Sequence, residues 1–140
     1  MMDDPLKAAV SVAASGLNAQ ATRMRVVSEN LANAQSTADV AGGEPYARKT
    51  ISFSEVLGAN EGVSRVRISG IDRDQSSFRS VHEPGHPAAD EDGFVLRSNV
   101  NTVSEVADMR EATRSYEANL QVIKQARQMI ESTIGLLRNR

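Results

Sequence analysis

Apolar residues recur at helical spacing in the first segment of the chain. They are separated by alternating steps of four and three residues, and Gln20 is the one polar member of the series. The apolar members are Leu6, Val10, Ala13, Leu17, Met24, Val27 and Leu31. Such a heptad pattern is typical of a helix that packs along one seam. Asp4 supplies an N-cap acceptor and Pro5 suits the first helical position, so we expect a helix of about 29 residues that ends near Asn33.

The last segment repeats this pattern along its whole length. Steps of three and four residues connect its apolar positions, with Thr113 and Arg127 as polar members. The apolar members are Val106, Met109, Tyr116, Leu120, Ile123, Ile130, Ile134 and Leu137. Thr102 and Glu105 have the spacing of a capping box, in which the hydroxyl and the carboxylate each bind a backbone amide at a helix start. We therefore predict a second long helix from Val103 to Leu137.

Helical periodicity is missing between these two segments, where seven of the nine glycines lie. Runs rich in β-branched residues predict strands at Lys49–Leu57, Val63–Ile71, Ser77–His82 and Phe94–Leu96, and Asp92-Gly93 predicts a tight turn before the last of them. The predicted fold is mainly α with a small β module. It has an N-terminal helix in residues 1–36, a short irregular β-rich middle in 37–101 and a long C-terminal helix in 102–140.

The middle segment is too poor in large apolar residues to cover both helical seams. Because most of a helix's stability comes from packing its apolar face, each seam needs a partner. One possibility is a helical hairpin that closes within a single monomer. The other is assembly, in which the terminal helices become ordered when they pack against other subunits. The spacing alone leaves both open.

Composition and charge exclude several classes of function. The 16 Lys and Arg residues are balanced by 18 Asp and Glu residues, which gives a net charge of -2 and no basic field for nucleic acid. The absence of cysteine excludes disulfides, thiolate catalysis and cysteine-ligated metal sites. No apolar stretch approaches the roughly 20 residues of a membrane helix. The N-terminal sequence also lacks the pattern of a cleaved signal peptide, so we expect none.

Only one segment matches a catalytic motif, and its context opposes the chemistry. His82-Glu83-Pro84-Gly85-His86 has the H-E-x-x-H spacing of zinc proteases. That motif needs both imidazoles on one face of a helix, and Pro84 with Gly85 opposes a helix by several kcal/mol. We predict a turn, and no metal site, at this position.

Other candidate sites are equally weak. The acidic run Ala89–Gly93 lacks the ligand series of a calcium-binding loop and is interpreted as a solvated turn. Gly42-Gly43 is not followed by the strand and helix of a phosphate-binding unit. Tyr116 lies on the C-terminal seam and is interpreted as a packing residue. We therefore expect no catalytic residue, no cofactor and no small-molecule substrate.

Several motifs resemble those of one protein family. Two groups in the first segment resemble the N-terminal signature of bacterial flagellar axial proteins, and they are Ser15, Gly16, Leu17 and Asn18, then Asn30, Leu31, Ala32 and Asn33. Further motifs resemble, in order and spacing, the proximal rod proteins within that family. They are Pro45–Lys49, Glu83–Pro87, Ala89–Val95, Asn99–Asn101 and Tyr116–Asn119. Ser98 replaces an expected proline and Val106 an expected methionine.

The resemblance implies a structural subunit of the rod, the drive shaft that crosses the periplasm and transmits torque from motor to hook. It implies a coiled-coil-like inner layer of terminal helices, a β-rich outer module and no enzymatic activity. It further implies export through the flagellar type III apparatus without a cleaved signal. The expected neighbours are further copies, other proximal rod proteins, and the adaptor that joins the rod to the export gate. A module that binds one partner without polymerising and a metal hydrolase are the alternatives.

Overall fold

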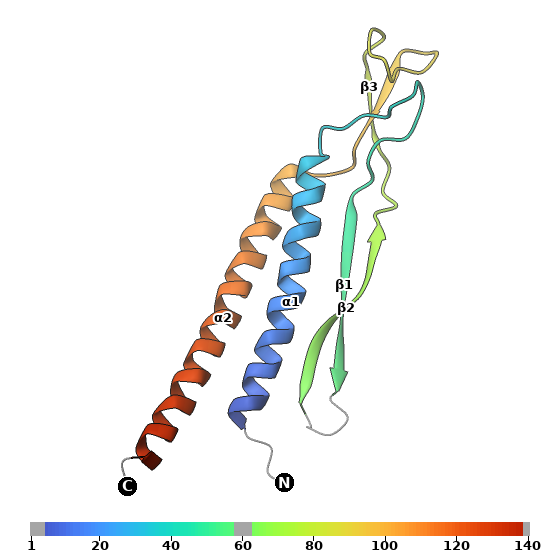
Figure 1. The fold of residues 1–140 in the computed structure, drawn as a ribbon. Coiled ribbons are helices and arrows are strands. Elements are labelled where there is room, and N and C mark those ends of the chain that lie inside the picture. The colour runs from blue at the N-terminus through green and yellow to red at the C-terminus, as the bar shows by residue number, and fades with distance from the viewer. Residues whose placement is uncertain (1–4, 58–62, 139–140) are drawn as a thin grey trace. The chain divides into compact units, whose positions relative to one another are not determined.

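The computed structural model describes residues 5–57 and 63–138. The elements in chain order are α1 (Pro5–Ala32), β1 (Lys49–Leu57), β2 (Ser64–Arg73), β3 (Arg79–His82), β4 (Phe94–Arg97) and α2 (Thr102–Arg138) (Figure 1). β1 pairs with β2, and β3 pairs with β4, in two separate two-stranded sheets. The predicted fold class, mainly α with two long terminal helices and a small β-rich middle, is confirmed.

The predicted element bounds agree closely with those observed. α1 has 28 residues and ends one residue before the predicted end, while the proposed cap Asp4 lies outside the described residues. β1 has the predicted bounds, and the other strands differ by one or two residues at their ends. Gly93 adopts a φ of +81°, and its amide donates to the Asp90 carbonyl at 3.0 Å, so the predicted turn before β4 is present.

The start of α2 differs from the prediction. Asn101, not Thr102, is the N-cap: its Oδ1 accepts hydrogen bonds from the backbone amides of Val103 and Ser104, both at 3.1 Å. Glu105 therefore lies one position too late for a capping box, and that prediction is wrong. The physical reason is that the Glu105 carboxylate is bound elsewhere, as described below.

The chain divides into two compact units. Among the described residues, the first unit comprises 5–23, 52–57, 63–70 and 111–138, and the second comprises 24–51 and 71–110. Each unit draws on both helices and on the middle segment. The division into segments 1–36, 37–101 and 102–140, which the sequence suggests for an assembled subunit, therefore stays a prediction.

Small residues form the core of the first unit. Its parts of α1 and α2 run antiparallel and side by side (Figure 1). The buried residues are alanines, namely Ala13, Ala19, Ala112 and Ala126. A Cβ atom on Gly16 would come within 2.8 Å of the Asn119 side-chain amide. The two helices can approach closely because Gly16 and these alanines leave room.

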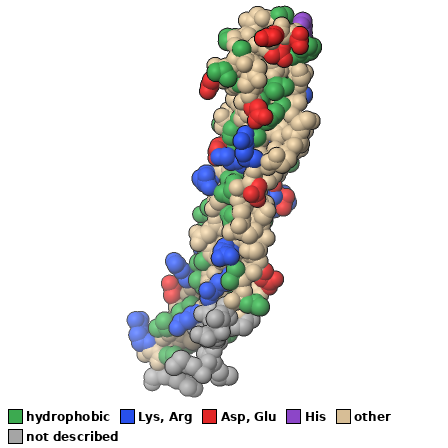
Figure 2. All heavy atoms as spheres, turned by 90° about the vertical axis from the view of Figure 1, so that its right-hand side faces the viewer, with side chains coloured by type: hydrophobic (Ala, Val, Ile, Leu, Met, Phe, Trp, Pro, Cys, Tyr) green, Lys and Arg blue, Asp and Glu red, His purple; other side chains and the backbone are tan. Residues whose placement is uncertain are grey.

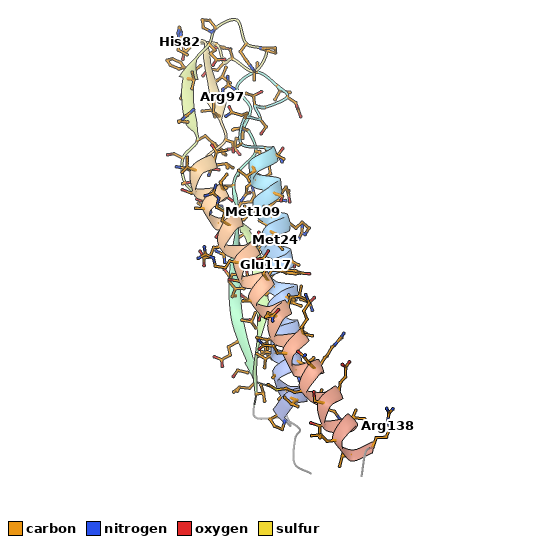
Figure 3. The ribbon with its side chains drawn as sticks, turned by 90° about the vertical axis from the view of Figure 1, so that its left-hand side faces the viewer. Met24, His82, Arg97, Met109, Glu117 and Arg138 are labelled. Atoms are coloured by element: carbon orange, nitrogen blue, oxygen red, sulfur yellow. The ribbon has the colours of Figure 1, made fainter. Side chains whose placement is uncertain are left out.

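The second unit has a different core, made of valines and polar groups. Val26, Val27 and Val95 are buried, together with Ala47 and Ala88. β3 and β4 pair antiparallel, with Arg79 opposite Arg97 and His82 opposite Phe94. Figure 3 shows Met24 of α1 and Met109 of α2 at the same level of the two helices.

Candidate assembly surface

A buried asparagine connects three segments of the second unit. Asn30, near the end of α1, is 1% exposed. Its Oδ1 accepts hydrogen bonds from the Lys49 backbone amide and the Tyr46 hydroxyl, both at 2.8 Å. Its Nδ2 donates to the Lys49 carbonyl at 2.9 Å and to Glu105 Oε2 at 3.0 Å. Asn30 thus holds the start of β1 and the start of α2 against the end of α1.

Glu105 is the charged member of this cluster and is 0% exposed. Its Oε1 accepts a hydrogen bond from Arg48 Nε at 2.6 Å, and Arg48 also forms an ion pair with Asp74 at 3.4 Å. A buried carboxylate without partners is strongly destabilising, and here Arg48 and Asn30 supply them. Burial alone would lower the pKa of Arg48, but its hydrogen bond and attraction to Glu105 raise that pKa above its ordinary value.

Two further groups of the cluster have shifted pKa values. Burial, followed by the negative charges of Glu29 and Glu105, raises the pKa of Tyr46 to about 12. Hydrogen bonds from the Ser76 backbone amide and side chain lower the pKa of Asp74, and Arg48 lowers it further. The folded chain therefore favours a neutral Tyr46 and an ionised Asp74.

Asn99 extends the cluster toward β3. Its Oδ1 accepts a hydrogen bond from the Arg48 backbone amide at 2.7 Å, and its Nδ2 donates to the carbonyl and hydroxyl of Ser76, both at 3.1 Å. Tyr46, Arg48 and Asn99 belong to motifs on which the family resemblance rests. Their contacts give those motifs a structural role within the chain. Sequence analysis missed this network because neither Glu105 nor Arg48 lies on an apolar seam.

The other signature motif makes contacts within the first unit. Ser15 Oγ donates to the Val12 carbonyl at 2.6 Å and accepts a hydrogen bond from the Val66 amide at 3.2 Å, which ties α1 to β2. Gly16 leaves room for Asn119 of α2. Leu17 is half-buried, and Asn18 is exposed. Three of the four residues therefore serve packing within the chain, and Asn18 points to solvent.

The N-terminal seam is covered to different degrees along α1. Ala13 and Val27 are buried, and the remaining seam residues are half-buried, namely Leu6, Val10, Leu17, Met24 and Leu31. In the second signature group Asn30 is buried, Leu31 and Asn33 are half-buried, and Ala32 is exposed. The predicted seam thus faces the interior along most of the helix.

The C-terminal seam is covered only in part within the single chain. Met109, Tyr116, Leu120, Ile123 and Ile130 are half-buried, whereas Val106, Ile134 and Leu137 are exposed. The most buried positions on α2 are Glu105, Ala112 and Ala126, each one residue before a predicted seam position. Ala112 and Ala126 have small side chains that permit close packing, whereas Glu105 is buried through its contacts with Asn30 and Arg48.

α2 also exposes large apolar residues that no contact within the described chain covers fully. Ile134 is 59% exposed, Leu136 is 75% exposed and Leu137 is 71% exposed. In the part of α2 that belongs to the first unit, we call the exposed set the apolar stripe, and it comprises Val122, Met129, Ile134, Leu136 and Leu137. The set extends around the helix, because Ile134 and Leu136 are two residues apart and lie on different sides of it. Val122, Met129 and Leu136 are seven residues apart, a spacing that sequence analysis could have detected as a second seam. Beside the stripe is an open cavity of about 770 Å³ lined by Leu6 of α1 and by Met129 and polar residues of α2.

The H-E-x-x-H segment forms a turn, as predicted. It begins at the last residue of β3 and continues through Pro84 and Gly85 without helical structure. The His82 ring lies 5.0 Å from the Phe94 ring, and His86 Nδ1 accepts a hydrogen bond from the Ala88 amide at 3.0 Å. In residues 5–57 and 63–138, no three His, Asp or Glu side chains gather closely enough to hold a metal ion.

Neither α1 nor α2, as described, combines the length and the apolar character that crossing a membrane requires. The surfaces that α2 exposes are apolar at intervals only, with charged residues between them. Such an amphipathic surface is suited to contact with other helices.

The sequence matches two families of flagellar proteins. Residues 11–38 match the family described as "Flagella basal body rod protein", and residues 91–136 match "Flagellar basal body rod FlgEFG protein C-terminal". The flagellar basal-body rod protein FlgC of Agrobacterium fabrum is 53% identical over 135 residues, which cover 96% of this chain and 97% of that relative. The FlgC proteins of Buchnera aphidicola and Salmonella typhimurium are 37% and 34% identical, over 90% and 89% of this chain and 93% and 92% of theirs.

Proposed function

This chain belongs to the FlgC family of flagellar basal-body rod proteins, and we propose that it builds the rod by packing its terminal helices against neighbouring subunits. As a member of that family it is a structural subunit of the basal-body rod. Its proposed neighbours are further copies, other proximal rod proteins and the adaptor at the export gate. In this role the subunit transmits torque mechanically and catalyses no reaction. It reaches the rod through the flagellar type III export apparatus.

The apolar stripe on α2 is the observation that supports this proposal. The first unit buries alanines, while Met129, Ile134, Leu136 and Leu137 remain exposed. Large apolar side chains at helical spacing stabilise a structure only when a partner removes them from water, at roughly 1.5–3 kcal/mol for each side chain fully buried. The helix therefore has more apolar surface than its own chain covers, and a second subunit can cover the rest.

A module that binds one partner without polymerising is the competing function. The antiparallel packing of α1 and α2 in the first unit favours a hairpin that already exists in a single chain. Such a hairpin could present the stripe to one protein only. The two functions differ in whether copies repeat along a rod, and electron microscopy of isolated basal bodies distinguishes them.

The test uses Ile134→Asp and Leu137→Asp in cells that lack the wild-type gene. Both residues are exposed in the single chain, so the substitutions leave its own packing intact. A carboxylate in a desolvated interface costs several kcal/mol without a partner cation. We expect normal protein levels, no rods in isolated basal bodies and no swimming. Leu120 and Ile123 are less suitable positions because they are half-buried in the chain itself.

Two control variants accompany these substitutions. Gln121→Asp adds the same carboxylate at an exposed polar position of α2, and Glu117→Lys changes the charge at another exposed position. Both controls should assemble and swim normally. Normal rods built from the Ile134→Asp and Leu137→Asp chains would contradict assembly through the stripe. A soluble complex with one partner, and no rod, would favour the single-partner module.

A further inference from the structure

We propose that the acidic tip of the β3–β4 hairpin in one copy inserts into a basic pocket at the base of the same hairpin in a second copy. Glu91 and Asp92 form the tip, and Arg79, beside the Arg97–Glu83 ion pair, supplies the uncompensated positive charge of the pocket. The inference rests on the proposed function, since it requires copies to meet in one assembly. All of these residues belong to the second unit.

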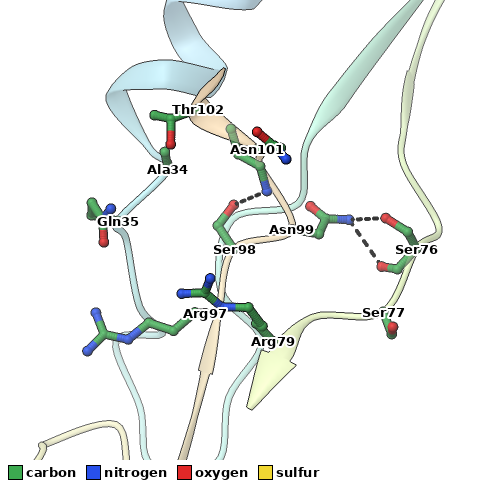
Figure 4. A pocket seen from close by; sticks show the side chains of 11 residues that line it. Ala34, Gln35, Ser76, Ser77, Arg79, Arg97, Ser98, Asn99, Asn101 and Thr102 are labelled. Atoms are coloured by element: carbon green, nitrogen blue, oxygen red, sulfur yellow. Dashed lines mark hydrogen bonds between the residues drawn. The ribbon is translucent and has the colours of Figure 1, made fainter. Parts of the chain in front are cut away.

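The pocket has a volume of about 380 Å³ and lies beside the ends of β3 and β4 and the start of α2 (Figure 4). Its lining contains two arginines, Arg79 and Arg97, several hydroxyl and amide groups, and no acidic residue. A volume of this size falls within the range of about 300–1,000 Å³ that is typical of ligand sites. The chemistry of the lining fits a carboxylate group.

One of the two arginines has no counter-charge within the described chain. Arg79 is directly opposite Arg97 in the β3–β4 register, and like charges at such positions destabilise a sheet. Arg97 Nη2 contacts both carboxylate oxygens of Glu83 at 2.8 Å. Arg79 is exposed and makes no ion pair with any described residue. An anion that enters the pocket would supply the counter-charge that Arg79 lacks.

The acidic tip is held in one conformation by its own turn. Asp90 Oδ1 accepts hydrogen bonds from the backbone amides of Asp92 and Phe94, at 3.0 and 2.7 Å. Gly93 takes the left-handed conformation that the turn requires. Glu91 and Asp92 are exposed, and their carboxylates bind no other described residue. Figure 2 shows acidic side chains gathered at this end of the second unit. A rigid tip loses little entropy on binding, which favours its use as a docking element.

The tip cannot reach the pocket of its own chain. Arg79 and Arg97 form the first pair of the hairpin, and His82 and Phe94 form the last pair before the turn. The three residue steps between these pairs span about 10 Å, and the turn lies beyond them on the far side. A contact between tip and pocket therefore joins two copies, and repetition along a rod favours the head-to-tail arrangement over a closed two-fold pair. Such heterologous contacts repeat, and they produce rings or helical filaments, as a rod requires.

Charge reversal provides the first test, in complemented cells that lack the wild-type gene. Arg79→Glu places a carboxylate opposite Arg97, which should favour the hairpin itself while removing the counter-charge for the tip. We expect Arg79→Glu and Asp92→Lys each to lower the number of rods per cell about tenfold, because like charges then meet at the interface. The two substitutions combined should restore rods to within about twofold of wild type. Arg73→Glu, at an exposed arginine of β2, is the matched control and should have no effect.

Cross-linking provides the second test, since the chain contains no cysteine. Chains with Arg79→Cys and chains with Asp92→Cys are produced together, and isolated basal bodies are oxidised. We expect a disulfide-linked dimer from this mixture and none when Asp72→Cys replaces Asp92→Cys, because only nearby cysteines can be bridged.

Several results would overturn the inference. Single reversals with normal rods, a charge swap that fails to restore assembly, or intact rods that yield no cross-linked dimer would each do so. If the swap fails and inorganic phosphate raises the melting temperature of wild-type protein but not of Arg79→Glu, the pocket binds a free anion instead. None of these outcomes contradicts the proposed function. That function fails only if the wild-type chain is absent from the rod or if the apolar stripe is not needed for assembly.

Discussion

Replacing Asn30 by alanine should strongly destabilise the second unit. The substitution removes four hydrogen bonds, to the amide and carbonyl of Lys49, to Tyr46 and to Glu105. Each such bond contributes about 0.5–1.5 kcal/mol, and a buried amide left unpaired costs about 1–3 kcal/mol. Alanine regains about 0.5 kcal/mol through its higher helix propensity. The expected net loss is about 3–5 kcal/mol, a large fraction of the 5–15 kcal/mol that stabilises a typical domain.

Urea unfolding followed by far-ultraviolet circular dichroism measures this loss on the purified chain. Hydrogen exchange of the Lys49 amide gives a local measurement, and we expect its protection to fall in parallel. Asn18→Ala is the matched control, because Asn18 lies on the same helix and is exposed, and it should change stability by less than about 0.5 kcal/mol. Asn30→Asp should be at least as harmful as Asn30→Ala, since it places a second carboxylate beside Glu105. A loss below about 1 kcal/mol for Asn30→Ala would refute the assigned role of the network.

Two further predictions concern packing and pH. Gly16→Ala should destabilise the chain by up to about 2 kcal/mol in urea unfolding, because the added Cβ overlaps Asn119. The double variant Gly16→Ala/Asn119→Ala should be more stable than Asn119→Ala alone by about 1 kcal/mol, since alanine favours the helix once the overlap is removed. Additive effects of the two substitutions would contradict the close approach of Gly16 and Asn119. Since the pKa of Tyr46 is about 12 in the folded chain and about 10 when unfolded, its contribution to stability should be complete below pH 10 and decline as the pH rises to 12. Tyr46→Phe should remove that part of the pH dependence in thermal melts, and an unchanged alkaline slope would show that another group causes it.

Local sequence signals predicted the elements of the fold, whereas they carry little information about which positions are buried within the single chain. Helix bounds follow from local signals such as Pro5, and strand bounds from β-branched runs between turn residues, so these predictions were accurate. Burial on α2 follows instead from how closely the helices approach, which Ala112 and Ala126 decide. A seam that is chosen by hydrophobicity contains the large apolar residues and passes over the alanines beside them. The residues that are buried within the single chain therefore lie beside the predicted seam, and the seam as an assembly surface stays a prediction.

The polar cluster shows a second limit of local sequence patterns. Thr102 and Glu105 satisfy the spacing of a capping box, yet Asn101 caps the helix. Glu105 is drawn into contacts with Asn30 and Arg48, which are distant in the sequence. A buried ion pair between remote residues leaves no periodic signal along the chain. The family signature marked Asn30 as notable, but only the structure shows that its side chain satisfies all four of its hydrogen-bonding positions.

Small and large apolar residues have different roles in the proposed assembly: small residues pack the single chain, and large exposed residues remain available for contacts between subunits. Residues that hold the first unit together are alanines and Gly16, which bury little area and give modest stability. The large side chains of the apolar stripe, such as Leu136, are largely exposed, and in the proposed assembly they are buried between subunits. Because the stripe is largely exposed in the single chain, substitutions there should affect assembly more than folding, whereas substitutions at Ala112 or Asn30 should first lower the stability of the single chain. The proposed assembly therefore predicts that the chain gains stability when its stripe is buried in the rod.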